Sequence, residues 1–137
     1  MREIRETLTA EQLAASIKKA AKEILIDINK RKDPGFDVPT RGSDNIAYDE
    51  KKDVIYLGEK ESRRSFHNTG TVNTFTQTLF TLSVLLESAE RKKHLTKREV
   101  YYQDPELFNK DQNASDNVIE DLAVIMGVTR PCLRVVA

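Results

Sequence analysis

Apolar residues recur every three or four positions near the start of the chain, which predicts an amphipathic helix. Thr9 and Gln12 form a capping-box pattern at its beginning. We expect the helix to end near Asp33-Pro34-Gly35, because proline cannot continue the hydrogen-bond ladder and glycine admits turn geometries. The apolar positions expected on its core face are Leu13, Ile17, Ala20, Ala21, Ile24, Leu25 and Ile28.

Two short strand-like runs follow Pro39 and predict a β-hairpin. They cover residues 45–48 and 54–57, and the charged segment 49–53 lies between them. Residues 71–90 then return to a helical pattern, with threonine-rich polar positions between the apolar ones. The apolar stripe expected on this helix consists of Val72, Phe75, Leu79, Leu82 and Leu86.

Two more helices are predicted nearer the C-terminus. Thr96 and Glu99 form a second capping box, so a helix should start at Thr96 and carry residues 98–102. Either Asn113 or Ser115 is expected to cap the helix that follows. The core face of that last helix is predicted to contain Val118, Ile119, Leu122, Ile125 and Met126.

The order of these elements predicts the fold class. The last helix should stop at Gly127, and the apolar, β-branched residues 133–136 look like a strand. Three helices that end in a strand are typical of a winged helix, in which a helix-turn-helix packs beside a small sheet. We therefore predict an α+β, mostly helical fold with two parts. An N-terminal helical arm covers residues 1–37, and a winged-helix domain with the hairpin covers residues 38–137.

Composition limits the ways in which this chain could meet a ligand. It has 22 basic and 22 acidic side chains and a formal net charge of zero, so any contact with nucleic acid must come from local basic patches. The most apolar stretch, residues 79–86, is far shorter than the ~20 residues of a membrane helix, so we expect no membrane contact. Cys132 is the single cysteine and is expected to be a small buried hydrophobe.

The segment Lys97 to Tyr102 carries the most informative chemistry. Arg98 and Tyr102 are four residues apart and therefore share one face of the predicted helix. A phenol with a pKa of about 10 is a weak nucleophile unless a nearby cation stabilises the phenolate, and a guanidinium can also grip a phosphate. Packing of the ring with a hydrated hydroxyl is the alternative interpretation. No metal site is predicted, because His67 and His94 are far apart in sequence.

Several motifs in order resemble the A subunit of topoisomerase VI and its relatives, the meiotic double-strand-break transesterases. The similarity covers roughly residues 38–137. Its motifs are residues 39–41 (PTR), 45–49 (NIAYD), 57–60 (LGEK), 63–66 (RRSF), 97–102 (KREVYY), 111–112, 115–116, Asp121 and 127–137 (GVTRPCLRVVA). The spacer between Tyr102 and Gln112 is similar to that of eukaryotic members.

This resemblance implies a type IIB mechanism, in which a tyrosine on a winged-helix domain attacks DNA and stays linked to a 5′ end. The second tyrosine of the pair maps to Tyr102, and the arginine four positions earlier maps to Arg98. The product would be a double-strand break with 5′-phosphotyrosyl ends. The family implies either an ATP-dependent type II topoisomerase or a meiotic DNA-breaking enzyme, and the sequence leaves that choice open.

The resemblance also implies partners and cofactors. Family members carry a Toprim domain whose acidic residues hold Mg²⁺, two copies share the active sites, and a separate B subunit hydrolyses ATP. Too few residues follow Tyr102 for a Toprim domain, so we expect this chain alone to be inactive. The expected partners are double-stranded DNA, a second copy and a B-like subunit. The expected compartment is the nucleus, or the cytoplasm in a prokaryote.

Basic residues near the tyrosine are the expected DNA contacts. The last predicted helix carries Asp116, Glu120 and Asp121, whose charges would repel phosphate unless they point away from it. We therefore expect DNA to meet the tyrosine helix and its neighbours: Lys97, Arg98, Arg130 and Arg134. The alternatives are a non-catalytic winged-helix module that binds DNA or docks another protein, and a structural piece that dimerises or docks through its N-terminal helix.

Overall fold

The computed structural model describes residues 2–137. The α-helices of this range are α1 (Ala10–Asn29), α2 (Val72–Glu90), α3 (Lys97–Tyr102) and α4 (Gln112–Met126). Two 3-10 helices join them, η1 (Ser43–Asn45) and η2 (Arg130–Leu133). The strands are β1 (Arg2–Glu3), β2 (Gly35–Pro39), β3 (Ile46–Asp49), β4 (Val54–Leu57), β5 (Glu61–Ser65), β6 (Leu95–Thr96) and β7 (Val135–Val136).

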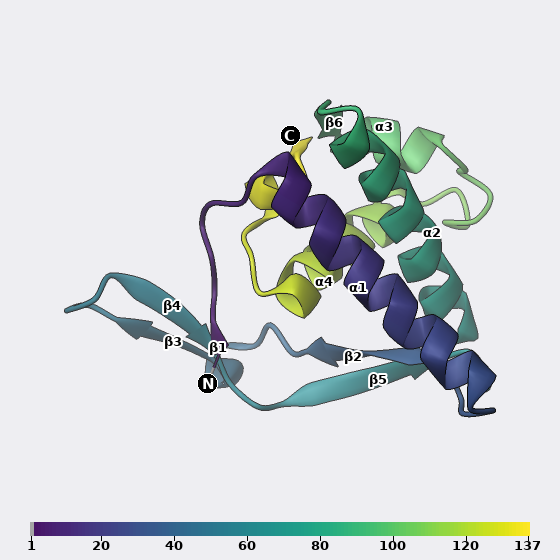
Figure 1. Cartoon of the computed structure of the whole chain (residues 1–137), viewed down its shortest axis with the longest axis horizontal. Helices are drawn as coiled ribbons and strands as arrows, with labels where there is room; N and C mark the ends of the chain where they lie inside the picture. The colour runs from purple at the N-terminus through teal and green to yellow at the C-terminus, as the bar shows by residue number, and fades with distance from the viewer. Residues whose placement is uncertain (1) are drawn as a thin grey trace.

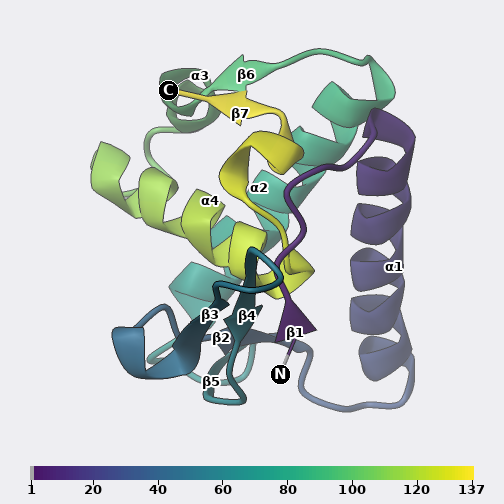
Figure 2. The ribbon, with the colours of Figure 1, turned by 90° about the vertical axis from the view of Figure 1, so that its left-hand side faces the viewer.

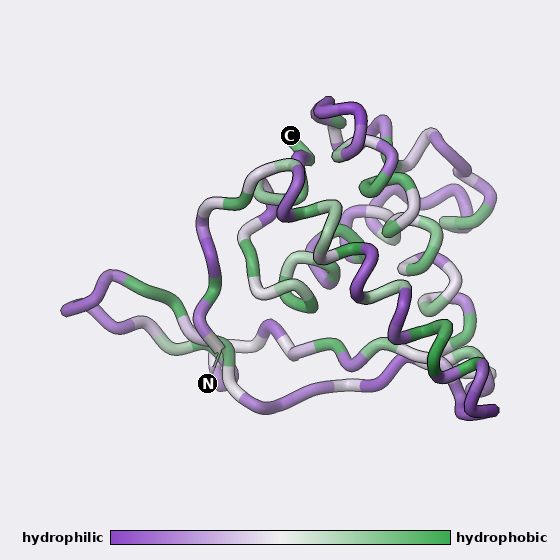
Figure 3. Tube along the Cα trace, viewed as in Figure 1, coloured by the Kyte–Doolittle hydropathy of each residue, from purple (hydrophilic) through white to green (hydrophobic). Residues whose placement is uncertain are grey.

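The helices pack around one hydrophobic core. Helix α1 lies across α2, α2 packs on α4, and the short α3 packs on α4 (Figures 1 and 2). Hydrophobic and hydrophilic positions alternate along the helices, whereas the tip of the projecting β3–β4 hairpin is hydrophilic (Figure 3). The largest fully buried side chains include Phe108, Leu13, Ile17, Leu85, Ile119 and Leu122. Cys132 is buried as predicted.

Helix α1 begins as the sequence predicts but buries less of its apolar face. The Thr9 side chain accepts a hydrogen bond from the Gln12 amide, and the Gln12 side chain accepts one from the Thr9 amide. Leu13, Ile17 and Ile24 are buried. The prediction that Leu25 and Ile28 face the core is wrong, since they are 60% and 52% exposed. Leu25 lies about 100° around the helix from Ile24, and the end of the helix is left uncovered at Ile28.

Helix α2 has the predicted bounds but a different buried face. Leu79 is exposed, whereas the threonines Thr78 and Thr81 are fully buried. The physical reason is that α2 contacts both α1 and α4 and therefore buries a wide arc. Burial of Thr78 is tolerated because its hydroxyl donates to the Thr74 carbonyl at 2.7 Å. An apolar stripe alone could not locate this face.

Small sheets accompany the helices. The predicted hairpin is confirmed as β3 and β4, which pair antiparallel, with β1 on the other edge of β4. Strands β2 and β5 form a second antiparallel ribbon, which the sequence did not predict, and it lies against α4 and α2. The domain boundary proposed at residue 37 falls inside β2. Strands β6 and β7 pair in parallel.

Two details near the C-terminus correct the prediction. Asp111 caps α4 in place of Asn113 or Ser115, because its side chain accepts from the Asn113 amide at 2.9 Å and Ser115 is buried one turn inside the helix. Leu133 closes the 3-10 helix η2, so the strand predicted for residues 133–136 shortens to β7. Gly127 ends α4 in the left-handed conformation, at φ 66°, as predicted.

The whole is an α+β, winged-helix-like fold, as the sequence predicts. Helices α3 and α4 stand in the positions of a helix-turn-helix, and the β6–β7 pair joins the start of α3 to the C-terminal segment. No helix among residues 2–137 has the length and apolar content needed to cross a membrane.

Candidate functional site

Helix α3 is short, with side-chain hydrogen bonds at both ends and a buried residue on its inner face. The Thr96 hydroxyl accepts from the Glu99 amide at 3.0 Å, and the Glu99 carboxylate accepts from the Thr96 amide at 3.4 Å. At the other end, the Gln103 side chain donates to the Glu99 carbonyl. Val100 is fully buried and anchors the inner face. Six residues are too few for a stable helix in isolation, so the cap and this anchor set the orientation of α3.

The two adjacent tyrosines of α3 have different environments. Tyr101 is half-buried, and its ring centroid lies 6.3 Å from that of Phe108. Tyr102 is 61% exposed, and its ring centroid lies 5.5 Å from that of Tyr101. Tyr101 is therefore a packing residue. It supports a neighbour whose hydroxyl bonds to no other group among residues 2–137.

Lys97 and Arg98 accompany Tyr102 on α3, and neither forms an ion pair within the described range. Arg98 is exposed, as is Tyr102 one helical turn later, while Lys97 is half-buried. A guanidinium without a carboxylate partner keeps its donors available for an anion such as phosphate.

The β6–β7 pair brings Arg134 to the start of α3. The Leu95 amide donates to the Arg134 carbonyl at 2.9 Å, and Arg134 Nε donates to the Lys93 carbonyl at 2.8 Å. Arg134 itself has φ 64°, in the left-handed region. These contacts hold its guanidinium next to the segment that enters α3.

Arg130 lies elsewhere and is already engaged. It belongs to η2, and its Nη1 is 3.8 Å from the Glu120 carboxylate on α4. Its Nε is buried without a hydrogen-bond partner. The structure thus groups Lys97, Arg98, Tyr102 and Arg134 about α3, while Arg130 is paired with α4.

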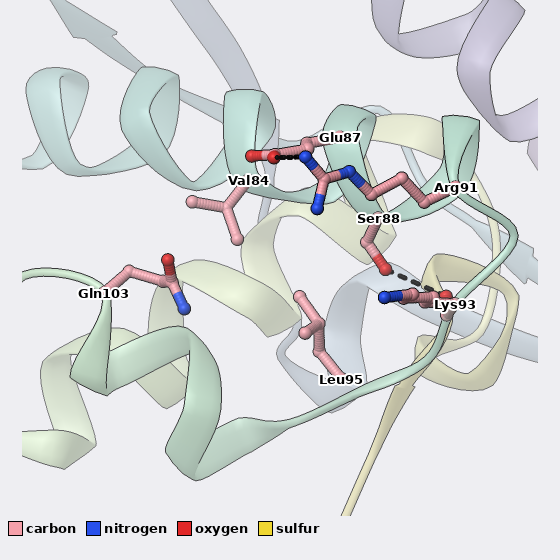
Figure 4. A pocket seen from close by; sticks show the side chains of 7 residues that line it. All are labelled: Val84, Glu87, Ser88, Arg91, Lys93, Leu95 and Gln103. Atoms are coloured by element: carbon pink, nitrogen blue, oxygen red, sulfur yellow. Dashed lines mark hydrogen bonds and ion pairs between the residues drawn. The ribbon is translucent and has the colours of Figure 1, made fainter.

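A shallow pocket of about 250 Å³ adjoins α3 at Gln103, the residue after Tyr102 (Figure 4). Arg91 Nη2 lies 2.9 Å from the Glu87 carboxylate at its rim, and the Ser88 hydroxyl donates to the Lys93 carbonyl at 2.8 Å. No pattern in the sequence indicated this pocket, because its walls come from α2, β6 and the end of α3.

Two of the three acidic residues of α4 are paired within the fold, whereas the buried Oδ1 of Asp116 has no hydrogen-bond partner among residues 2–137. Asp121 is buried, and one carboxylate oxygen accepts from Arg64 on β5 while the other lies 3.4 Å from Arg41. Glu120 is paired with Arg130. The sequence placed Arg41, Arg64 and Asp121 in separate motifs, and only the packing of β5 on the helices brings them together.

The described residues offer no recognisable metal centre. Among residues 2–137, no group of three or more histidine, cysteine, aspartate or glutamate side chains is arranged to hold an ion. The Mg²⁺ that the resemblance implies therefore has no fitting ligand set in this part of the chain.

Together these observations define a winged-helix-like α+β domain with an exposed tyrosine and an unpaired arginine on its first helix-turn-helix element. Residues 73–135, which contain α2 from its second residue onward together with α3 and α4, match the family model described as type IIB DNA topoisomerase. The chain belongs to this family and is similar to the N-terminal part of the A subunit of topoisomerase VI.

Relatives from archaea and plants support this assignment. The chain is 38% identical over 122 residues to the A subunit of type 2 DNA topoisomerase 6 of Pyrococcus abyssi, covering 84% of this chain and 32% of the relative. It is 40% identical over 102 residues to the A3 subunit of DNA topoisomerase 6 of Oryza sativa subsp. indica, covering 74% of this chain and 23% of the relative. For the corresponding protein of Arabidopsis thaliana the identity is 36%, with 74% and 24% covered.

The chain therefore spans about a third or less of the length of these relatives. No solved structure matches it significantly.

Proposed function

We propose that this chain is the N-terminal DNA-cleavage domain of a type IIB topoisomerase A-like protein, with Tyr102 as the nucleophile. The observation that carries the proposal is the exposed Tyr102 hydroxyl, one helical turn from the unpaired Arg98, inside the segment that matches the family. A nucleophile must reach a phosphate in a stiff duplex, and an exposed ring on a rigid short helix meets that requirement.

The proposed step is a transesterification. The Tyr102 oxygen attacks a DNA phosphorus, a new phosphotyrosyl ester forms at the 5′ end, and the bond from that phosphorus to the 3′ oxygen breaks. The phenol proton is lost and the departing 3′ oxygen gains a proton, so the reaction needs no oxidant or external energy. One ester replaces another, and religation is the reverse of the same step.

Arg98 is proposed to bind the scissile phosphate and stabilise the charge that develops on its oxygens. A guanidinium offers paired donors that match two phosphate oxygens. Lys97 and Arg134, which both lie at the start of α3, would hold neighbouring backbone phosphates. Arg130 would take part only after it leaves Glu120, so its contribution should be the smallest of the four.

The whole reaction is proposed to need parts beyond the described residues. Double-strand cleavage requires two tyrosines, hence two copies of the protein. A Mg²⁺ ion on a Toprim domain, and an ATP-hydrolysing B-like subunit for topoisomerase activity, complete the proposed assembly. Such an enzyme works where DNA is, in the nucleus of a eukaryote or the cytoplasm of a prokaryote. Meiotic break formation is the other activity that the same tyrosine chemistry would serve.

A non-catalytic winged-helix module is the second candidate. An exposed tyrosine beside an arginine is also suited to stacking or to a phosphate contact without covalent chemistry. Here the same surface would bind DNA or dock another protein, and the phenol oxygen would remain unmodified.

The test is covalent capture of DNA by a chimera. Residues of this chain replace the matching ones of the Pyrococcus abyssi relative, and the chimera is assayed with its B-type partner on end-labelled DNA. We expect Tyr102→Phe to abolish the covalent adduct. Tyr101→Phe is the matched control and should keep it, because Tyr101 packs on Phe108. If adducts survive Tyr102→Phe, Tyr102 is not the nucleophile. If the unsubstituted chimera binds DNA but forms none, the non-catalytic module is favoured.

A further inference from the structure

An apolar groove lies at the opposite end of the helices from the strand pair β6–β7. It is about 480 Å³ in volume and opens between the end of α1, the segment after β5 and α2. The buried Ile24 and Phe75 form its floor, and the walls are Ile28, Phe66 and Leu79. These walls are exposed although each is a large apolar side chain.

The floor is continuous with the hydrophobic core. The Phe75 ring centroid lies 5.5 Å from that of the buried Phe36 and 6.1 Å from that of Phe66, which is 51% exposed. On α1, Ile28 follows Ile24 by four residues and therefore lies on the same side of the helix, one turn beyond the part that the core covers. The core thus extends into the groove, and no described element covers it there.

The rim of the groove is basic. Arg31 and Lys32 follow the end of α1, and neither forms an ion pair with a residue in the described range. His67 stands on the other side, where its ring nitrogen lies 3.5 Å from the Asp33 carboxylate. Asp33 is held by the His67 amide at 2.8 Å, and the groove lining contains no carboxylate.

We propose that this α1–α2 groove binds an amphipathic helix of a partner protein, one with carboxylates beside its apolar face. An apolar trough of this kind accepts side chains at helical spacing, as in helix-in-groove recognition. The unpaired Arg31 and Lys32 select a negatively charged flank, because like charges at a desolvated rim are strongly unfavourable. Exposed apolar patches with polar rims mark such contact sites.

A second copy of this chain fits the groove less well. A symmetric contact between two copies places the same surface on both sides, so Arg31 and Lys32 of each copy would face a lining that carries basic residues and no carboxylate. A partner of opposite charge avoids this repulsion. The groove is separate from the tyrosine site, since it shares no residue with α3.

The test is binding of a fluorescein-labelled amphipathic helical peptide, with leucines at helical spacing and glutamates on the flanks, measured by anisotropy. A second peptide carries lysines in place of the glutamates. We expect the glutamate peptide to bind at least tenfold more tightly than the lysine peptide, on the order of the selectivity that charge at a rim provides. Ile28→Glu should weaken binding of the glutamate peptide about tenfold or more, as loss of a central apolar contact does.

Leu25→Glu is the matched control. It adds the same charge to the same helix at a site that is 60% exposed and does not line the groove, so binding should change less than about twofold. Circular dichroism checks that both variants keep their helices. Equal binding of the two peptides, or unchanged binding by Ile28→Glu, would overturn the proposal. So would a dimer of the chain in light scattering that Ile28→Glu dissociates, because the occupant would then be a second copy.

Discussion

Arginines at two places in this domain have opposite surroundings. At the closed site, Arg41 and Arg64 meet the buried carboxylate of Asp121, and the contact ties β5 and the segment after β2 to α4. At the open site, Arg98 stands with Lys97 and Tyr102 on α3, without an acidic partner in the described range. Both sites lie in segments that resemble the same family.

This contrast distinguishes structural arginines from arginines that are available to a ligand. A guanidinium that is matched by a buried carboxylate already has its charge compensated and contributes to the fold. A guanidinium held on a rigid, capped helix with no partner has its donors free for a phosphate. Substitution of a paired arginine should therefore affect stability, and substitution of an unpaired arginine should affect ligand binding.

Breaking the closed site should have the largest effect. Asp121→Ala leaves Arg41 and Arg64 without their partner, so we expect the free energy of unfolding to fall by about 3 kcal/mol. Partial exposure of both arginines keeps the loss at the low end of the range for buried pairs. Urea denaturation measures it. Glu106→Ala, at an exposed pair with Lys110, should change stability by less than about 0.5 kcal/mol. A loss of similar size for both would contradict the special role of Asp121.

Removing the cap of α3, which supports the open site, should lower the free energy of unfolding by a smaller amount. Thr96→Ala deletes the cap of α3 and should lower the free energy of unfolding by about 1 kcal/mol. Because Tyr102 and Arg98 depend on α3 for their orientation, DNA binding should weaken as well. Thr96→Ser keeps the hydroxyl and serves as the control in thermal unfolding and in filter binding. If Thr96→Ser behaves like the alanine variant, the cap is not what positions the helix.

Removing Arg98 itself should hardly change the stability of the fold. Arg98→Ala should change the free energy of unfolding by less than about 0.5 kcal/mol, because no partner inside the fold is lost. The slope of log affinity for duplex DNA against log salt should fall by about one, the share of one phosphate contact. Arg91→Ala is the comparison variant, since Arg91 is paired with Glu87. Equal slopes for wild type and Arg98→Ala would remove Arg98 from the DNA contact.

The smallest effect is expected at Asp33, a half-buried aspartate near the end of α1. A hydrogen bond from the Ser65 side chain, helped by the His67 amide and charge, lowers the pKa of the Asp33 carboxyl below its ordinary 3.8. Its stabilising contribution is therefore present above that ordinary value and is lost as the pH falls through the lower pKa of the folded state. The melting temperatures of wild type and Asp33→Asn should differ slightly at neutral pH and converge in acid. A gap that widens in acid would reverse the inferred sign.

Much of the helical framework could be predicted from local signals. The two capping boxes marked the starts of α1 and α3, the left-handed Gly127 marked the end of α4, and the hairpin followed from its two apolar runs. Such signals act over a few residues and are legible without the rest of the chain. The ribbon of β2 and β5 was missed, because its partners are distant in sequence and β5 is largely polar.

Sequence by itself also placed Arg98 and Tyr102 on one short helix and related the chain to type IIB topoisomerases, since both depend on residue order. Which apolar residues are buried and which charged residues are paired depends on the packing of the whole domain. This packing buries Thr78 and leaves Ile28 exposed. It also pairs Asp121 with two arginines, whereas Arg98 has no ion-pair partner in the described range. The physical reason is that burial and charge compensation depend on what other elements bring from far along the chain, whereas caps and helix faces depend on neighbours within one or two turns.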